Sequence, residues 1–470
     1  MPMPGQGSKQ PHSPSFVPEL LIHWIVQAAT GSWRVAMATF VLLLIVWLMT
    51  IMSWIVARIA QSGREAAILS VVLVATPLIA AGALGRFGSN DAGAFFPWLF
   101  FVQPNSHGGT FLLALTAAAV AGRATTHAMA YGPIWVALLS FVAYASDQLT
   151  LVFFLAPVTA ALLGAAVVQV GSRQSALRVL AGAWGGAALG GACTVEVDRQ
   201  YMLRPTPSSM LEHAGRFLAD LGHHPVPVLT IAALTLGLVA IAWRREPRTW
   251  VAGFWPIFAT SSAVGSLALT MVLYEDIGSF RYAHPLLWWA AMFAAAALAK
   301  RGRSLARRLP RRPFGAACLA SGLALSGPLA GWHVPRLLVW DSPPASCLRQ
   351  AGMRAGLAEY WYARLTSAAS DWGIQVEQVD SFGAARIWGN DRLWFTHDIH
   401  DTSRRPRFQF VIIDSLPEDR IAAAYGKPDR RMACGSATVW IYDEPGKLYR
   451  DLARASPGLE DLFAVAPPNF

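Results

Sequence analysis

The sequence predicts an α-helical polytopic membrane protein with about ten transmembrane helices and a small C-terminal α/β soluble domain. Only 14% of the 470 residues are charged and 54% are hydrophobic, whereas an ordinary soluble domain has roughly 25% charged residues. The deficit is confined to residues 36–335, where long apolar runs occur, while residues 340–470 have an ordinary soluble composition. The two parts of the chain are therefore expected to face different solvents.

Three regions follow from this division. Residues 1–34 are predicted to be a disordered tail followed by an interfacial helix, because residues 1–15 are rich in Pro, Gly, Ser and Gln and the apolar stretch at 16–29 is too short to span a bilayer. Residues 35–331 form the predicted transmembrane domain, and residues 332–470 the soluble domain. The first long apolar run exceeds the length of a signal-peptide core, so no cleavable signal peptide is expected.

About ten apolar segments predict the transmembrane helices. The fourth and fifth are nearly continuous and meet at Ser146-Asp147-Gln148, so together they are too long for one helix and predict a tight helical hairpin. The segments lie at about 35–57, 66–85, 107–121, 130–146, 148–170, 175–192, 226–243, 251–273, 284–299 and 314–331.

The distribution of basic residues predicts the orientation of these helices. The formal charge of +10 is carried largely by short clusters between apolar segments, including 244–248 and 300–312, which the positive-inside rule places in the cytoplasm. An even number of spans then puts both termini outside, and the C-terminal domain is expected to be periplasmic. Because these clusters are loop charges, nucleic acid is not an expected partner.

The C-terminal region alternates between helical and strand patterns. Helices are predicted at 356–369, 417–425 and 447–455, and strands at 374–379, 408–413 and 437–442. Cys347 and Cys434 both lie in this region and are a candidate disulfide if the domain is outside the cytoplasm; two buried free thiols are an equally compatible arrangement. Upstream, residues 208–221 predict an amphipathic surface helix.

Three candidate functional residues lie in or beside the first two predicted outer loops. Asp91 is a candidate general base or cation ligand, and otherwise a turn or helix-capping residue. His107, at the start of the third segment, is a candidate for phosphate binding or proton transfer, and otherwise an interfacial histidine. Asp147 lies in the hairpin turn with no adjacent Lys or Arg. A carboxylate there is unfavourable unless another loop supplies a cation, or unless it simply caps the following helix.

The stretch from Tyr274 to Pro285 is the most informative of the outer loops. It places Glu275, Asp276, Arg281 and Tyr282 at the outer end of the ninth segment. A guanidinium group suits phosphate oxygens, so Arg281 is a candidate phosphate ligand; a structural ion pair with Asp276 or Asp147 is the alternative. The chain lacks GxxxxGK[ST], HExxH and GxSxG motifs, which argues against a P-loop ATPase, a zincin protease and a GxSxG hydrolase.

These features resemble the GT-C class of polytopic membrane glycosyltransferases, which use polyprenyl-phosphate-linked sugars. The resemblance rests on many spans, Asp91 in an early outer loop, an Arg-Tyr-x-x-Pro element (Arg281, Tyr282, Pro285) and a soluble outer C-terminal domain. The stretches 356–361 and 408–413 also resemble uncharacterised bacterial membrane proteins grouped near these enzymes.

The resemblance implies hexosyl or pentosyl transfer to a glycan, lipid or protein acceptor in the cell envelope. An acceptor hydroxyl would attack the anomeric carbon, with Asp91 as the base and Arg281 holding the departing phosphate. His107, Glu275, Asp276 and Tyr282 would contribute to substrate binding. The class often has paired acidic residues in the first outer loop, whereas Asn90 precedes Asp91 here, so Asp147 is the alternative base. The sequence identifies no cofactor, and a divalent metal is compatible with this chemistry.

Two other functions remain open at this point. One is a non-catalytic, membrane-anchored envelope assembly or binding protein that works through its C-terminal domain. The other is a transporter of a lipid-linked substrate, which would need a polar path to the cytoplasmic side and broken helices near the bilayer midplane. The enzyme predicts instead that Asp91, Asp147 and Arg281 converge on one outer cavity.

Overall fold

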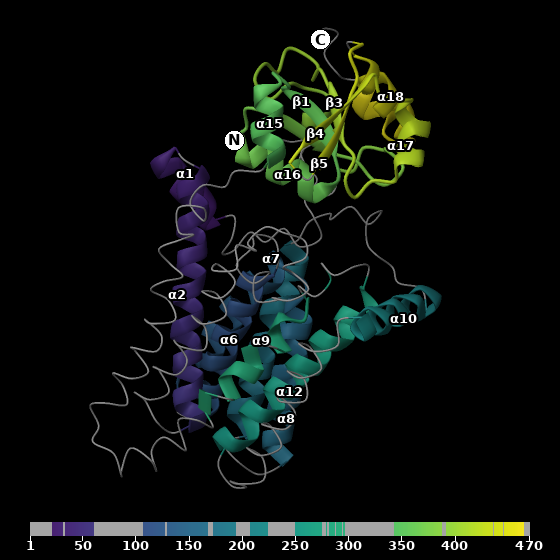
Figure 1. Ribbon diagram of the computed structural model, residues 1–470. Helices are drawn as coiled ribbons and strands as arrows, with labels where there is room; N and C mark the ends of the chain where they lie inside the picture. The colour runs from purple at the N-terminus through teal and green to yellow at the C-terminus, as the bar shows by residue number, and fades with distance from the viewer. Residues whose placement is uncertain are drawn as a thin grey trace, which may run out of the picture. The chain divides into compact units, whose positions relative to one another are not determined.

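The computed structural model forms two compact units, which are described separately (Figure 1). The helical unit contains the described residues up to 296, and the C-terminal unit contains those from 343 onwards. The structure describes residues 21–31, 33–60, 107–126, 129–167, 173–193, 207–223, 250–274, 279, 282–286, 288–293, 295–296, 343–387, 392–435, 437–444 and 446–464.

The helices of the helical unit follow the predicted apolar segments closely. The segments that begin near residues 35, 107, 130, 175 and 251 each coincide with one helix, and the segment at 148–170 is a short π-helix continued by an α-helix. The predicted interfacial and amphipathic helices correspond to α1 and α10. The elements are α1 (Leu21–Thr30), α2 (Trp33–Ala60), α6 (Gly108–Thr126), α7 (Gly132–Ser146), the π-helix η2 (Leu151–Leu155), α8 (Ala156–Val167), α9 (Arg173–Cys193), α10 (Pro207–His223) and α12 (Trp250–Val272).

Two helices in the described ranges, Ala38–Ala60 and Gly253–Val272, are long and apolar enough to cross a bilayer. The helices Gly132–Ser146 and Leu151–Gly164 are apolar but shorter. The segments predicted at 66–85, 226–243 and 314–331 lie outside the described residues, and the one at 284–299 is described only in part. The count of about ten spans therefore stays a prediction.

Glycines hold α7 and α9 in close contact. Three glycines, spaced four residues apart along α9, face successive backbone carbonyls of α7, and a Cβ atom at any of them would lie less than 3.0 Å from a carbonyl oxygen. Small residues at this spacing let two backbones approach, which is a common way for apolar helices to pack. The pairs are Gly182 with Pro133 (2.5 Å), Gly186 with Ala137 (2.1 Å) and Gly190 with Phe141 (2.7 Å).

Aromatic side chains fill much of the core around α12. Phe254 and Phe258 stack with ring centroids 5.8 Å apart, and the Trp289 ring meets the Phe258 ring edge to face at 5.6 Å. Trp54 of α2 contacts Trp255 of α12 in the same way at 6.5 Å. Such pairs contribute beyond their buried area, by about 0.5–1.5 kcal/mol each. The core therefore joins α2, α12 and the segment around residue 289.

The C-terminal unit is built on a five-stranded mixed sheet in the order β2-β1-β3-β5-β4. β1 is parallel to both β2 and β3, whereas β5 is antiparallel to β3 and β4. The strands are β1 (Ala355–Ala358), β2 (Gln375–Gln378), β3 (Phe410–Ile412), β4 (Arg430–Cys434) and β5 (Ala437–Ile441). The helices are α15 (Pro343–Gln350), α16 (Tyr360–Ala369), the short 3-10 helix η5 (Arg392–Phe395), α17 (Glu418–Tyr425), α18 (Lys447–Ala455) and α19 (Glu460–Ala464).

Helices cover both faces of this sheet (Figure 1). Leu348 of α15 and Ala363 of α16 pack against one face, and Ile421 of α17 and Leu448 of α18 pack against the other. The small α/β domain expected for this region is thus present. The single helix predicted at 356–369 is wrong at its start, because residues 356–358 belong to strand β1. Strand β4 and helices α15 and α19 were not predicted.

Candidate functional site

A buried hydrogen bond joins two side chains that lie forty positions apart in the helical unit. His107 immediately precedes α6, and Asp147 lies in the turn between α7 and η2. The Nδ1 atom of His107 is 2.6 Å from Oδ2 of Asp147. The Asp147 side chain is fully buried, and the His107 side chain is 9% exposed. Both members of the pair are therefore buried, and the imidazole is the less completely buried of the two.

Both carboxylate oxygens of Asp147 accept hydrogen bonds. Oδ1 accepts the backbone N–H of Leu149 at 2.9 Å, which closes the turn after α7. Oδ2 accepts the Thr110 hydroxyl at 2.9 Å, in addition to its contact with His107. A buried carboxylate needs such partners, because an ionised group without them is strongly unfavourable in apolar surroundings. Asp147 thus both caps the turn and binds a group from another segment.

The backbone at His107 is in a conformation that few residues adopt. Its φ angle is +65°, in the left-handed region, while its carbonyl already accepts the N–H of Phe111 at 3.1 Å. For a residue other than glycine this region is sparsely populated, and such outliers persist where surrounding contacts hold them. The bond to Asp147 is one such contact, and the geometry turns the imidazole toward the α7–η2 turn.

A third segment, around residue 283, completes the cluster. The Tyr282 ring lies 5.3 Å from the His107 ring, centroid to centroid, at an interplanar angle of 31°. Two positions later, the fully buried His284 packs edge to face against Phe111 at 5.3 Å and Phe153 at 5.5 Å. Phe153 belongs to η2, and short π-helices are frequent at functional sites. Residues from three predicted outer loops therefore meet over an aromatic layer.

The pair has the geometry of an oriented histidine base. When Nδ1 carries the ring proton, it donates to Asp147, and Nε2 is left with a lone pair that can accept a proton from a substrate hydroxyl. A carboxylate that fixes the tautomer and stabilises the protonated ring is the arrangement used by His–Asp pairs in acyl transfer. The site can thus remove or deliver one proton in a water-poor environment.

The structure brings together three of the residues predicted from the sequence, namely His107, Asp147 and Tyr282. The other predicted site residues, Asp91, Glu275, Asp276 and Arg281, lie outside the described residues. Within the described ranges, no group of three or more His, Cys, Asp or Glu side chains is arranged to hold a metal ion.

Thr110 and His284 were not predicted as members of the cluster. Each could have been selected from its sequence distance to a residue that was predicted. Thr110 follows His107 by three residues, which places it on the same face of the first helical turn. His284 follows Tyr282 by two residues, in the stretch already chosen for its charged side chains.

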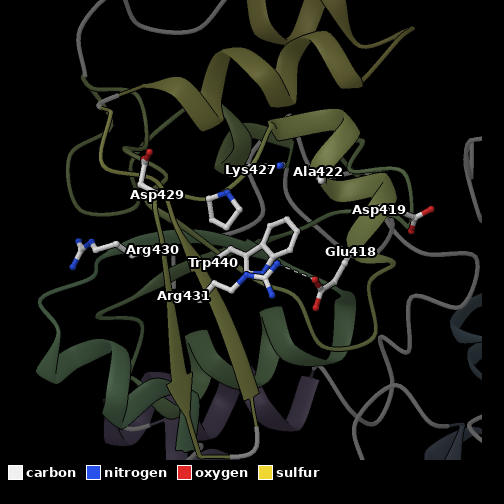
Figure 2. Close-up of a pocket in the computed structure, with 9 residues that line it drawn as sticks. Glu418, Asp419, Ala422, Lys427, Asp429, Arg430, Arg431 and Trp440 are labelled. Atoms are coloured by element: carbon white, nitrogen blue, oxygen red, sulfur yellow. Dashed lines mark hydrogen bonds and ion pairs between the residues drawn. The ribbon is translucent and has the colours of Figure 1, made fainter.

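The C-terminal unit carries a separate shallow depression of about 480 Å³ (Figure 2). Helix α17, the 427–429 loop and the strands β4 and β5 line it. Hydrogen bonding to Asp443 raises the pKa of Arg430 at its rim, and the same contact lowers the pKa of Asp443. The lining residues are Glu418, Asp419, Ala422, Lys427, Pro428, Asp429, Arg430, Arg431 and Trp440.

Cys347 and Cys434 form a disulfide with a Cα–Cα distance of 5.5 Å. The bond ties α15, which opens the C-terminal unit, to the last residue of the edge strand β4. The sequence had left open whether these cysteines were bonded or free.

No protein-family model, no curated protein and no solved structure matches this chain.

Proposed function

We propose that this chain is a multi-pass membrane glycosyltransferase that moves a sugar from a polyprenyl-phosphate donor to an acceptor hydroxyl at the outer face of a bacterial cytoplasmic membrane. In this proposal about ten helices span the membrane, and the C-terminal unit lies in the periplasm. The observation that carries it is the His107–Asp147 pair, packed beside Tyr282. The disulfide is compatible with an oxidising compartment for the C-terminal unit.

The geometry favours a revised distribution of roles within this reaction. Asp147 is fully buried and already accepts three hydrogen bonds, so it is better suited to orient His107 than to meet the acceptor. His107, the less completely buried member of the pair, takes the proton as the acceptor oxygen attacks the anomeric carbon. The sugar–phosphate bond then breaks, and the leaving phosphate departs with the electron pair. Arg281 is the proposed ligand of that phosphate.

The aromatic layer supports this assignment. The Tyr282 ring packs beside His107, and Phe111 and Phe153 pack against His284, two positions further along the same segment. Removing water from such a site strengthens the electrostatic interaction between the carboxylate and the protonated ring. It also limits hydrolysis of the activated donor, because water is the competing acceptor.

The test is a set of substitutions that preserve the local backbone. Asparagine tolerates the left-handed conformation, so His107→Asn removes the imidazole at little backbone strain. Asp147→Asn keeps an acceptor for the Leu149 N–H and removes the charge that faces His107. We expect each to reduce sugar transfer by roughly 10²–10⁴-fold, the usual contribution of a general base. The matched control is His213→Asn, since the Nδ1 atom of His213 lies 2.9 Å from the Val272 carbonyl oxygen and the residue is part of α10, away from the pair in sequence.

The measurement is the composition of surface glycans in a host that depends on this chain, with the amount of chain in the membrane determined in parallel. Normal glycans in both His107→Asn and Asp147→Asn at normal chain levels would refute the proposal. Loss of glycans in His213→Asn as well would show that the effect is structural, and would equally count against a specific role for the pair.

A further inference from the structure

The depression of the C-terminal unit has an aromatic floor that an arginine covers. Trp440 of β5 and Arg431 of β4 are direct register partners, so their side chains lie together on the face that carries α17. The Arg431 guanidinium lies over the indole at 5.1 Å from the ring centroid and donates to Glu418 at 3.1 Å (Figure 2). Three elements, β4, β5 and α17, thus build one small assembly.

The Arg431 side chain is held over the indole by a weak ion pair with Glu418. The Arg431 and Glu418 side chains are 58% and 54% exposed, and an ion pair in that environment contributes little to stability. Beneath it, Trp440 is only 1% exposed, and its indole N–H meets no acceptor in the part of the chain that the structure describes. A buried donor without an acceptor is unfavourable, and a ligand oxygen would relieve it.

The charges around the floor balance. Three acidic and three basic side chains line the depression, so neither a polyanion nor a polycation is favoured. Carboxylates accept hydrogen bonds, whereas Lys and Arg donate them, and a hydroxyl group can do both. The volume of about 480 Å³ is in the range of small-molecule sites. The charged side chains are Glu418, Asp419, Asp429, Lys427, Arg430 and Arg431.

We propose that this depression binds a neutral, hydroxyl-rich saccharide. The ligand displaces Arg431 from the indole, places its apolar C–H face on Trp440, and exchanges hydrogen bonds with Glu418 and Arg431. The Trp440 N–H then acquires an acceptor. The proposal uses residues of the C-terminal unit alone, so it holds whether or not the His107–Asp147 pair transfers a sugar.

The experiment uses the full-length chain in a detergent without a sugar headgroup, because maltoside detergents would compete for the site. Saturation-transfer NMR measures binding of three probes, maltotriose, chitotriose and mannotriose, at up to about 10 mM. Arg431→Ala and Glu418→Gln are the test variants, and Trp440→Phe retains the ring but removes the N–H. The matched control is Arg450→Ala, since the Arg450–Glu444 pair is similarly exposed, at 52% and 59%.

We expect at least one probe to bind, and the affinity to fall about tenfold or more in Arg431→Ala and Glu418→Gln but to change less than about twofold in Arg450→Ala. Trp440→Phe should also weaken binding. Binding of none of the three probes by the unaltered chain overturns the proposal, as does unchanged binding in both test variants. A tetra-alanine peptide is included as a competing ligand, because an extended peptide can add to the exposed edge strand β4. If the unaltered chain binds this peptide and none of the saccharides, the proposal is also overturned.

Discussion

Two adjacent glycines of α9 offer a sharp test of the helical unit. Gly186 packs against the α7 backbone, whereas a Cβ atom added at Gly185 would have no other atom within 4 Å. The substitutions Gly186→Ala and Gly185→Ala therefore add the same methyl group to the same helix, one residue apart. Any difference between them reports on the contact with α7 and not on helix propensity.

The expected loss in free energy of unfolding follows from one Cβ-to-carbonyl distance. A Cβ atom at Gly186 would lie 2.1 Å from the Ala137 carbonyl oxygen, which is 0.9 Å inside the 3.0 Å that real Cβ contacts respect (3.0 − 2.1). The obstacle is backbone, so α7 and α9 must move apart, at about 1–3 kcal/mol. Both alanines favour the helix by the same roughly 0.5–1 kcal/mol, so this contribution cancels between the variants. Because the alanine at Gly185 is accommodated, the two variants should differ by about 1–3 kcal/mol in free energy of unfolding.

The assay is reversible unfolding of the purified full-length chain in mixed detergent micelles of increasing SDS content, followed by circular dichroism. At Gly182 and Gly190 the added Cβ atom would lie 2.5 and 2.7 Å from a carbonyl oxygen of α7. The free energies of unfolding of Gly182→Ala and Gly190→Ala should therefore lie between those of Gly186→Ala and Gly185→Ala. If Gly186→Ala is as stable as Gly185→Ala, α7 and α9 do not pack in this register and the reasoning fails.

Three further predictions concern the C-terminal unit. Replacing Cys347 and Cys434 by serine should lower the thermal stability of this unit by about 4–5 kcal/mol, because the bond closes a loop with a sequence separation of 87, and reductant should have the same effect on the unaltered chain. Burial raises the pKa of Tyr449 to about 12. The free energy of unfolding contributed by its neutral phenol is therefore fully present below about pH 10 and is lost as the pH rises through 12. Alkaline unfolding followed by tyrosinate absorbance measures this loss. Gly356→Ala should destabilise the unit by about 1–3 kcal/mol in thermal unfolding, because its Cβ would meet the Phe410 ring at 2.3 Å, and a neutral effect would contradict this packing.

His107, Asp147 and Tyr282 could be selected from the sequence, but the pairing of His107 with Asp147 could not. A carboxylate in a tight apolar hairpin required a partner, so Asp147 was expected either to meet a cation from another loop or to cap the following helix. His107 was selected separately, as a histidine at a helix start. Only packing between the α6 and α7 segments determines that the two meet, because forty residues separate them and no local pattern encodes that distance.

The missed strands of the C-terminal unit have particular causes. β1 has the sequence Ala-Gly-Leu-Ala, without β-branched or aromatic residues, because Gly356 must leave room for the Phe410 ring. β4 is an edge strand whose residues are mostly exposed, so it lacks the alternating pattern that reveals a half-buried strand. In contrast, β5 and α18 are strongly patterned, and the predicted bounds of α18 agree with the structure.

The short π-helix after Asp147 lets the chain carry one residue more than a regular helix over nearly the same rotation. Each π-turn accommodates one more residue than an α-turn, so η2 absorbs a single surplus residue between Asp147 and α8. Deleting one residue from Leu151–Leu155 would therefore restore regular α-helical spacing and leave the α7–η2 turn near its present angle about the axis of α8. Deleting one residue from α8 itself would instead rotate that turn by about 100°, and the aspartate would point away from the imidazole although neither residue of the pair had been changed.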